Sequence, residues 1–303
     1  AGDMVYKLKK PVRFPYLDFS TLALREAACR AEIRLNRRLA PGVYLGVVPL
    51  VATSDGLSLG GTGAITDWLV VMRRLDENQT LEHAIQAHHV ETWQLDRLAA
   101  TLVRFYRRAI PVFIAPAVYL SDWHRILSFN RRVLLDPRLD MPSGLVRRID
   151  RVQRDCLSRR SKMLADRVRK RKIVDGHGDL RPEHIWLGDP VKIIDCLEFN
   201  PRLRAVDPID EIAFLSLECE RLGAAWVGEH VKRRVVRGEP AGELYLFYRC
   251  HRAMLRARLA IAHLLEPNPR TPGKWPLLAR AYLRIAAADS TRLERLLKTP
   301  GDR

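Results

Sequence analysis

The clearest local signals in the sequence are the stretch His177-Gly178-Asp179-Leu180-Arg181-Pro182-Glu183-His184 and the run Val191-Lys192-Ile193-Ile194-Asp195 that follows it. Between them, Ile185-Trp186-Leu187 is apolar and Gly188-Asp189-Pro190 is a turn signal. Gly178 permits a close turn, and Pro182 stops a helix from running on. We therefore expect a hairpin of two short strands, with Asp179 before the first strand and Asp195 after the second.

The two aspartates of this hairpin lie 16 residues apart in the sequence. Metal-assisted phosphoryl transfer needs one carboxylate that orients the attacking hydroxyl and another that holds Mg²⁺ against the transferred phosphate. A lone His-x-Asp is more often an ordinary surface turn with a capping aspartate. The complete arrangement of loop, strand, turn and strand-ending aspartate favours phosphoryl transfer instead.

These residues resemble the catalytic loop of the aminoglycoside phosphotransferase-like branch of the protein-kinase-like superfamily, in particular the bacterial group known only as aminoglycoside phosphotransferase family enzymes. The resemblance implies ATP and Mg²⁺ as cofactors, Asp179 as catalytic base, Asp195 as metal ligand, and His177 as organiser of the loop. The family loop usually ends in a metal-binding Asn, and His184 stands there. An imidazole can ligate a metal, but it is a poorer partner for Mg²⁺ than an amide oxygen.

The first 75 residues read as a small β-rich N-terminal lobe. Met4–Leu8 predicts a strand, and a helix capped by Asp18 or Ser20 should run to about Leu39. Further strands are expected over Val43–Thr53 and Trp68–Met72. This order of strand, helix, strand and strand resembles the kinase N-terminal lobe from its third strand onward.

The same resemblance assigns nucleotide-binding roles in this lobe. Lys7 resembles the strand lysine that contacts the α- and β-phosphates, and Glu32 resembles the helix glutamate that holds it. Glu26 is the competing partner, and an exposed strand lysine is the alternative for Lys7, because Lys9 and Lys10 sit beside it. Met72, Arg73 and Arg74 resemble the hinge, whose backbone groups would meet the adenine.

The phosphate-covering turn of the family is missing from this sequence. Two strands and a glycine-rich turn should precede Lys7, and only six residues do. The run Gly60-Gly61-Thr62-Gly63 lacks the required spacing and predicts a hairpin turn. We expect either a truncated chain or a nucleotide site that lacks this phosphate-covering turn. In the second case the phosphates of the nucleotide would remain exposed to water.

Residues 76–303 read as a mostly helical C-terminal lobe that carries the catalytic loop 177–184 and the metal site near Asp195. Long helices are expected over Tyr245–Leu265 and Trp275–Leu297. Asp207 should cap a helix that begins at Pro208, although the family often has an Asp-Pro here that supports the catalytic loop. The expected fold class is therefore α+β, a two-lobed protein-kinase-like fold with an incomplete N-terminal lobe.

The net charge of +17 is concentrated in the segment 145–172, which holds twelve Lys/Arg against three Asp. Its apolar spacing predicts one amphipathic helix with a basic outer face. That face would suit nucleic acid or another polyanion, but a solvated helix face is the simpler interpretation. No aromatic residues interleave the basic ones, which argues against base stacking.

Cysteine spacing and hydropathy restrict the class of protein further. The five cysteines are widely spaced and form no Cys-x-x-Cys, which argues against a disulfide framework or a zinc site. The longest uncharged stretches contain proline and are too short to span a bilayer. These features predict a cytoplasmic enzyme that does not contact membranes.

The sequence as a whole predicts an ATP-dependent phosphotransferase that acts on a hydroxyl of a small molecule, either aminoglycoside-like or another hydroxylated metabolite. A polycationic drug needs an acidic pocket, which a chain of this charge would supply only through a local cluster. Candidate acidic residues lie close together in the sequence: Asp207, Asp210, Glu211, Glu218 and Glu220. The alternative is a catalytically weak kinase-like module that binds a nucleotide or polyanion for regulation.

Overall fold

The computed structural model describes residues 2–14, 17–238 and 242–298. The chain divides into two compact units. The first unit comprises Ala1–Ala109 and Asp175–Val206, so the hairpin that carries Asp179 and Asp195 folds together with the N-terminal strands. The second unit comprises Ile110–Val174 and Asp207–Arg303. The boundary at residue 75 expected between two kinase lobes is a different division and stays a prediction.

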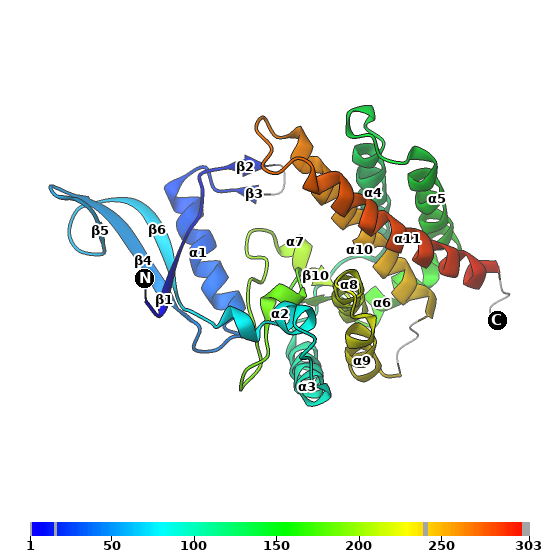
Figure 1. Cartoon of the computed structure of the whole chain (residues 1–303), viewed down its shortest axis with the longest axis horizontal. Helices are drawn as coiled ribbons and strands as arrows, with labels where there is room; N and C mark the ends of the chain where they lie inside the picture. The colour runs from blue at the N-terminus through cyan, green and yellow to red at the C-terminus, as the bar shows by residue number, and fades with distance from the viewer. Residues whose placement is uncertain (1, 15–16, 239–241, 299–303) are drawn as a thin grey trace. The chain divides into compact units, whose positions relative to one another are not determined.

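An antiparallel sheet and one helix form the core of the first unit (Figure 1). Its strands are β1 (Met4–Leu8), β6 (Ala64–Arg73), β4 (Tyr44–Thr53) and β5 (Gly56–Leu59), hydrogen-bonded in that order. Helix α1 (Leu22–Asn36) packs its apolar side chains on β4 and β6. Because Lys7 pairs with Val70, which belongs to the core that α1 covers, the β1 register places Lys7 on the face nearest the helix.

Two expectations for this sheet were wrong in detail. The cap of α1 is Thr21, whose hydroxyl accepts from Leu24 N–H at 3.3 Å, and not Asp18 or Ser20. The run Gly60–Gly63 is not a hairpin turn, because β5 and β6 lie on opposite sides of β4 and the run crosses between them. At Gly63 a Cβ would lie 2.4 Å from the Ala52 carbonyl oxygen, so this crossing requires glycine.

The catalytic hairpin has the predicted construction. Strand β8 (Ile185–Trp186) pairs antiparallel with β9 (Lys192–Ile193), so Asp179 precedes the first strand and Asp195 follows the second. The remaining elements of the first unit are β2 (Arg13–Phe14), β3 (Leu17–Asp18), α2 (Leu81–Gln86), α3 (Thr92–Arg108), α7 (Pro201–Arg204), β10 (Ala205–Val206), and the 3₁₀ turns Glu77–Gln79 and Pro182–His184. The short strand β7 (Val174–Asp175) lies where the chain passes from the second unit to the first.

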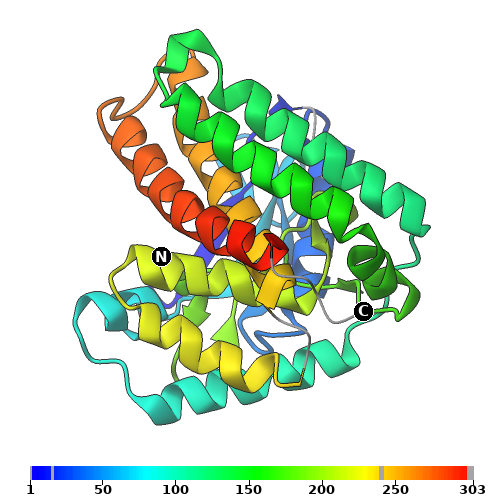
Figure 2. The same ribbon diagram turned by 90° about the vertical axis from the view of Figure 1, so that its right-hand side faces the viewer.

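The second unit is a helical bundle whose core lies between α5, α8, α10 and α11. Helices α10 and α11 run side by side (Figure 2). Its elements are α4 (Pro116–Leu134), α5 (Ser143–Arg159), α6 (Ser161–Arg169), α8 (Pro208–Arg221), α9 (Ala225–Val235), α10 (Gly242–Ala262), α11 (Lys274–Lys298), and the 3₁₀ turns Pro137–Leu139 and His263–Leu265. The two long C-terminal helices expected from the sequence are confirmed.

The expectation of one continuous basic helix over 145–172 was wrong. The helix breaks at Arg160, which leaves the helical conformation and separates α5 from α6. The Arg160 guanidinium pairs with Glu243 of α10 at 2.6 Å, so this arginine is held by a neighbouring helix instead of continuing the basic face. The helix start at Pro208 is confirmed, with the Asp207 carboxylate accepting from Ile209 N–H at 3.0 Å.

Within the described ranges, no helix is long and apolar enough to cross a membrane. All five cysteines are free and buried.

Candidate active site

Five charged side chains of the first unit form an alternating chain, which we call the charge ladder: Asp195, Lys7, Glu32, Lys9 and Glu198. Lys7 Nζ donates to Asp195 Oδ1 at 2.5 Å and to Glu32 Oε1 at 2.8 Å. Lys9 Nζ donates to Glu32 Oε2 at 2.7 Å and also to Glu198. The structure therefore brings Lys7 and Glu32 together as the sequence predicted, and Glu26 pairs with Arg30 instead.

The ladder is buried at its centre and open at one end. The side chains of Glu32 and Lys9 are 0% and 4% exposed, whereas those of Lys7 and Asp195 are 38% and 45% exposed. Burial opposes the charged form of Lys7, but Glu32 and Asp195 outweigh it and raise the Lys7 pKa above its ordinary value. The open end thus presents a permanent cation beside a carboxylate.

The backbone at Asp195 is held in an unusual conformation. Its φ of +65° lies in the left-handed region, which residues other than glycine adopt at a cost. The Tyr44 hydroxyl accepts from Asp195 N–H at 3.2 Å, and the Asn36 side chain accepts from Cys196 N–H at 2.9 Å. Burial acts to raise the Asp195 pKa, but Lys7 and His184 outweigh it and lower the pKa, so the carboxylate stays ionised.

His177 is buried and forms hydrogen bonds to both ends of the hairpin that carries Asp179 and Asp195. Its Nδ1 accepts from Asp179 N–H at 3.3 Å, so Nε2 carries the proton and donates to the Ile194 carbonyl at 2.9 Å. The ring therefore connects the two ends of the hairpin. Burial and the neighbouring His184 lower the pKa of His177 to about 4, which keeps the imidazole neutral.

The Asp179 carboxylate is held on one of its oxygens by Arg181. The guanidinium Nε and Nη2 donate to Asp179 Oδ2 at 3.0 and 2.9 Å. Arg181 also pairs with Glu183 through Nη1. Within the described residues, Asp179 Oδ1 has no hydrogen-bond donor, and the side chain is 23% exposed. One oxygen of the predicted base is fixed and the other is available to a ligand.

His184 lies between the two aspartates. Its Nδ1 donates to the Asp179 carbonyl at 2.9 Å, which leaves Nε2 as the acceptor atom of the ring. That atom lies 3.6 Å from Asp195 Oδ2 and accepts from Arg181 Nη2 at 3.2 Å. Asp195 and His184 are thus close enough to ligate one cation, provided that Arg181 and Lys7 give way.

The side chains at this site supply only a small set of protein ligands for Mg²⁺, namely the Asp195 carboxylate and the His184 imidazole. Among residues 2–14, 17–238 and 242–298, no group of three His, Cys, Asp or Glu side chains could hold a metal. Mg²⁺ in phosphoryl-transfer sites is usually held by one or two carboxylates together with the substrate phosphates and water. One carboxylate and one imidazole can supply the protein's part of such a shell, with the nucleotide completing it.

The hinge residues predicted from the sequence are already engaged through their backbone. Met72 pairs in the sheet with Val5 and Tyr44, and its side chain is buried. Arg73 N–H donates to the Val43 carbonyl at 2.9 Å, and Arg74 N–H donates to the Asp3 carbonyl at 2.8 Å. These two amides are therefore already used in hydrogen bonds within the first unit. Adenine binding by Met72, Arg73 and Arg74 stays a prediction.

Sequence reasoning missed four residues that build this site: Lys9, Asn36, Tyr44 and Arg181. Lys9 carried a signal, because residues two apart in an extended chain share a face and Lys9 therefore follows Lys7. Arg181 also carried one, since it stands in the loop two residues after the predicted base. Asn36 and Tyr44 carried none, because a buried hydrogen bond to a loop 150 or more residues away leaves no local pattern.

Four of the five acidic residues proposed as a pocket for a polycation pair with arginines of the second unit. Arg167 pairs with Asp207 at 2.6 Å, and Arg252 with Asp210 at 2.7 Å. Glu218 pairs with Arg256 at 2.9 Å and accepts from the Tyr282 hydroxyl at 2.8 Å. Glu220 pairs with Arg249, and Glu211 is fully buried. These carboxylates do not form an acidic surface.

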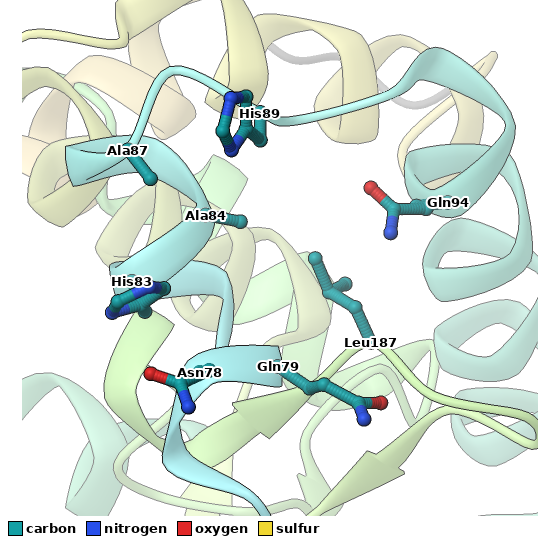
Figure 3. A pocket seen from close by; sticks show the side chains of 8 residues that line it. All are labelled: Asn78, Gln79, His83, Ala84, Ala87, His89, Gln94 and Leu187. Carbon is teal, nitrogen blue, oxygen red and sulfur yellow. The ribbon is translucent and has the colours of Figure 1, made fainter.

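A pocket of about 230 Å³ lies in the first unit beside α2 and the catalytic hairpin (Figure 3). Five neutral polar or imidazole side chains and three apolar ones line it: Asn78, Gln79, His83, Ala84, Ala87, His89, Gln94 and Leu187. None belongs to the charge ladder or the catalytic loop. Leu187 connects the pocket to the hairpin, because Leu187 N–H donates to the Gln79 carbonyl at 2.8 Å.

Comparison with known proteins finds uncharacterized relatives in sequence. No protein-family profile matches the chain. Uncharacterized proteins of Mycobacterium bovis and of two strains of Mycobacterium tuberculosis are each 34% identical over 279 residues, which covers 89% of this chain and 54% of theirs. The chain therefore spans about half the length of the curated relatives that it matches.

Two solved structures are similar to the chain. A choline/ethanolamine kinase family protein from Mesorhizobium loti aligns with a TM-score of 0.52 and 18% identity, covering 99% of this chain and 84% of that one. An ethanolamine kinase of Plasmodium vivax aligns with a TM-score of 0.49 and 10% identity, covering 93% and 75%. The first likeness shows that the fold is the two-lobed protein-kinase-like fold expected from the catalytic loop.

Proposed function

We propose that this protein is an ATP-dependent, Mg²⁺-assisted phosphotransferase that transfers the γ-phosphate to a hydroxyl group of a small molecule. The observation that carries the proposal is the position of Lys7 Nζ, which contacts Glu32 at 2.8 Å and Asp195 at 2.5 Å. Three residues far apart in sequence thus assemble a phosphate-binding cation, its anchor and a metal carboxylate. A kinase-like site needs these three parts together.

The contacts of each side chain in the site suggest its role in the proposed reaction. Asp179 orients the acceptor hydroxyl through its available Oδ1 and accepts the hydroxyl proton as transfer proceeds. Arg181 fixes the other carboxylate oxygen and brings a positive charge next to the reacting phosphate. Lys7 binds the nucleotide phosphates, and Asp195 with His184 would hold Mg²⁺. When bound, the metal ion would neutralise charge on the phosphates.

We infer that the acceptor is a neutral or anionic hydroxylated metabolite and not a polycationic aminoglycoside. Four of the five acidic side chains proposed to attract a polycation are paired with arginines of the second unit. The net charge of +17 also repels such a molecule at long range.

A second candidate function is a kinase-like module that binds nucleotide weakly and serves regulation. One observation favours it: cations of the chain itself occupy the metal-binding atoms. Lys7 contacts Asp195 Oδ1 at 2.5 Å, and Arg181 Nη2 lies 3.2 Å from His184 Nε2. Both must move before a metal ion can bind, which costs binding free energy.

Thermal unfolding with ATP and Mg²⁺ tests the proposal on three proteins: the wild type, Asp195→Asn and Asp189→Asn. Asp189 lies in the same hairpin but is 85% exposed and outside the ladder, so its variant is the matched control. A ligand at 100 times its Kd stabilises by about 2.7 kcal/mol, which raises the melting temperature by a few degrees. We expect this Mg²⁺-dependent shift in the wild type and the control, and its loss in Asp195→Asn.

ADP release in the presence of a panel of acceptor alcohols then separates the two candidate functions. Turnover that depends on one class of alcohol supports the enzyme. A Mg²⁺-dependent shift without turnover on any acceptor favours the regulatory module. No shift with wild-type protein would contradict both.

A further inference from the structure

We propose that Arg204 is a positioning residue that fixes the predicted base Asp179 relative to the metal aspartate Asp195. The proposal rests on the function proposed above, in which these two carboxylates act on one reaction. Among the described residues, Arg204 forms no hydrogen bond to either carboxylate. It contacts the chain shortly before the loop of Asp179 and shortly after Asp195, and its side-chain stem packs against the loop itself.

The guanidinium of Arg204 connects two segments that are far apart in the sequence. Its Nε donates to Asp175 Oδ1 at 2.8 Å, and its Nη1 donates to the Leu197 carbonyl at 2.7 Å. Asp175 lies two residues before the loop 177–184, and Leu197 lies two residues after Asp195. Because the Arg204 side chain is only 6% exposed, water competes little for these hydrogen bonds. One planar group therefore sets the spacing between the two segments.

The backbone and the stem of Arg204 also support the loop of Asp179 directly. The Gly176 N–H donates to the Arg204 carbonyl at 2.8 Å. Gly178 has a φ of +87°, and a Cβ on it would lie 3.3 Å from Arg204 Cγ and 3.0 Å from the Leu203 carbonyl oxygen. Both the conformation and the close packing therefore favour glycine immediately before Asp179. Arg204 thus forms part of the surface on which this loop rests.

The Asp175 carboxylate accepts from a second arginine as well. Its Oδ2 accepts from Arg38 Nη1 at 3.1 Å, while Oδ1 accepts from Arg204. Arg38 Nη2 also donates to the Gly176 carbonyl at 2.8 Å. Removal of Arg204 therefore leaves Asp175 paired with Arg38, so a variant of Arg204 does not leave a carboxylate without a counter-charge.

Arg204 is not the only side chain that joins the segments of Asp179 and Asp195. His177 also joins them, because its Nε2 donates to the Ile194 carbonyl. Phosphoryl transfer requires the acceptor hydroxyl and the metal ion to be aligned with the same phosphate. A displacement of about 1 Å can cost about 10²-fold in rate. We expect the loss of the Arg204 link to reduce kcat and to leave the Kd for ATP close to its wild-type value, since the charge ladder keeps its own contacts.

The test compares Arg204→Met with Arg202→Met. Arg202 is the exposed arginine of the same short helix, α7, and makes a matched control. ADP release from ATP and Mg²⁺, with the acceptor alcohol identified in the panel above, gives kcat, and calorimetry gives the Kd for ATP. Circular dichroism establishes that each variant is folded at the assay temperature. The kcat of Arg204→Met should fall by about ten- to a hundredfold, and that of Arg202→Met should equal the wild-type value.

The variant Arg204→Lys separates a link with two arms from a simple need for positive charge. Lysine keeps the charge, but its single ammonium lacks the fork with which the guanidinium reaches Asp175 and the Leu197 carbonyl together. We therefore expect Arg204→Lys to lose nearly as much kcat as Arg204→Met. Wild-type kcat in either variant would overturn the proposal. Where Arg204→Met does not fold, Arg204→Lys decides the question.

Hydrogen exchange in the ligand-free protein tests the link without any substrate. Amide exchange in residues 176–180 and in residues 194–198 should become faster in Arg204→Met and stay unchanged in Arg202→Met. Faster exchange in only one of these segments, or in neither, would show that Arg204 does not join them. If the wild type turns over no acceptor, the proposed function fails and the catalytic part of this inference fails with it. Exchange then still decides whether Arg204 joins the two segments, so the two failures are distinguishable.

Discussion

The charge ladder of the first unit and the arginine–carboxylate pairs of the second unit use the same chemistry in different ways. Both bury acids against bases, but the ladder ends in Lys7 and Asp195, which are 38% and 45% exposed. Two pairs of the second unit are closed: Arg167 and Asp207 are 6% and 0% exposed, and Arg252 and Asp210 are 8% and 7% exposed. Burial and ion pairing are therefore common to both regions. The feature that distinguishes the ladder is an exposed end, whose atoms can exchange one partner for another.

The first and largest expected effect concerns the catalytic loop beside the open end of the ladder. Asp179→Asn removes the proton acceptor and should lower kcat by about 10²–10⁴-fold. Affinity for ATP should change little, because Asp179 does not belong to the ladder. Steady-state turnover and calorimetry measure the two quantities, with Asp189→Asn as control. Full turnover in Asp179→Asn would show that another group is the base.

The second prediction breaks a closed pair. Arg252→Met leaves Asp210 buried without its partner and should destabilise the protein by about 3–5 kcal/mol in urea denaturation. Where the variant is folded, ATP affinity should equal that of the wild type. The double variant Arg252→Met/Asp210→Leu should recover most of the stability, and Arg284→Met on the exposed side of α11 is the control. A loss of ATP affinity in folded Arg252→Met would erase the distinction between the two regions.

The third prediction concerns pH and the buried His177. The pKa of His177 is lowered from an ordinary 6.5 to about 4 in the folded protein. Between these two pH values the unfolded chain therefore binds a proton at His177 and the folded protein does not. The contribution of His177 to stability is therefore complete above pH 6.5 and is lost as the pH falls toward 4, about 3 kcal/mol in all.

Denaturation of the wild type and of His177→Asn between pH 4 and 7 isolates this contribution. Burial also lowers the pKa of His251, but that residue titrates in both proteins and cancels. The wild type should lose more stability on acidification than the variant does. Parallel curves would contradict the assigned neutral state of His177.

The fourth and smallest effect is expected on the basic surface of α5. Arg147→Glu/Arg151→Glu reverses two exposed charges and should change stability by less than about 0.5 kcal/mol. Binding of a DNA duplex, measured at two salt concentrations, tests the polyanion hypothesis on the same pair of proteins. Strongly salt-dependent binding that the variant loses would support that hypothesis. Absent or salt-independent binding would favour the simpler interpretation, in which the basic surface of α5 is a solvated helix face.

Local pattern was enough for several parts of this molecule. The loop 177–184, the turn at Gly188–Pro190 and the apolar runs around it predicted the hairpin and its two aspartates. Alternation and capping residues also predicted β1, β4 and the helix at Pro208. These features depend on neighbours in the sequence, so a short window contains the information that specifies them.

The tertiary structure alone decided how those parts are completed. It showed that Glu32 accepts from two lysines, that Tyr44 and Asn36 hold the loop of Asp195, and that Asp210 and Glu218 of α8 pair with arginines. It also split the basic segment at Arg160 and placed β5 and β6 on opposite sides of β4. Each of these depends on contacts between residues far apart in the chain. The identity of a residue specifies its charge, whereas its partner is fixed only when the chain packs.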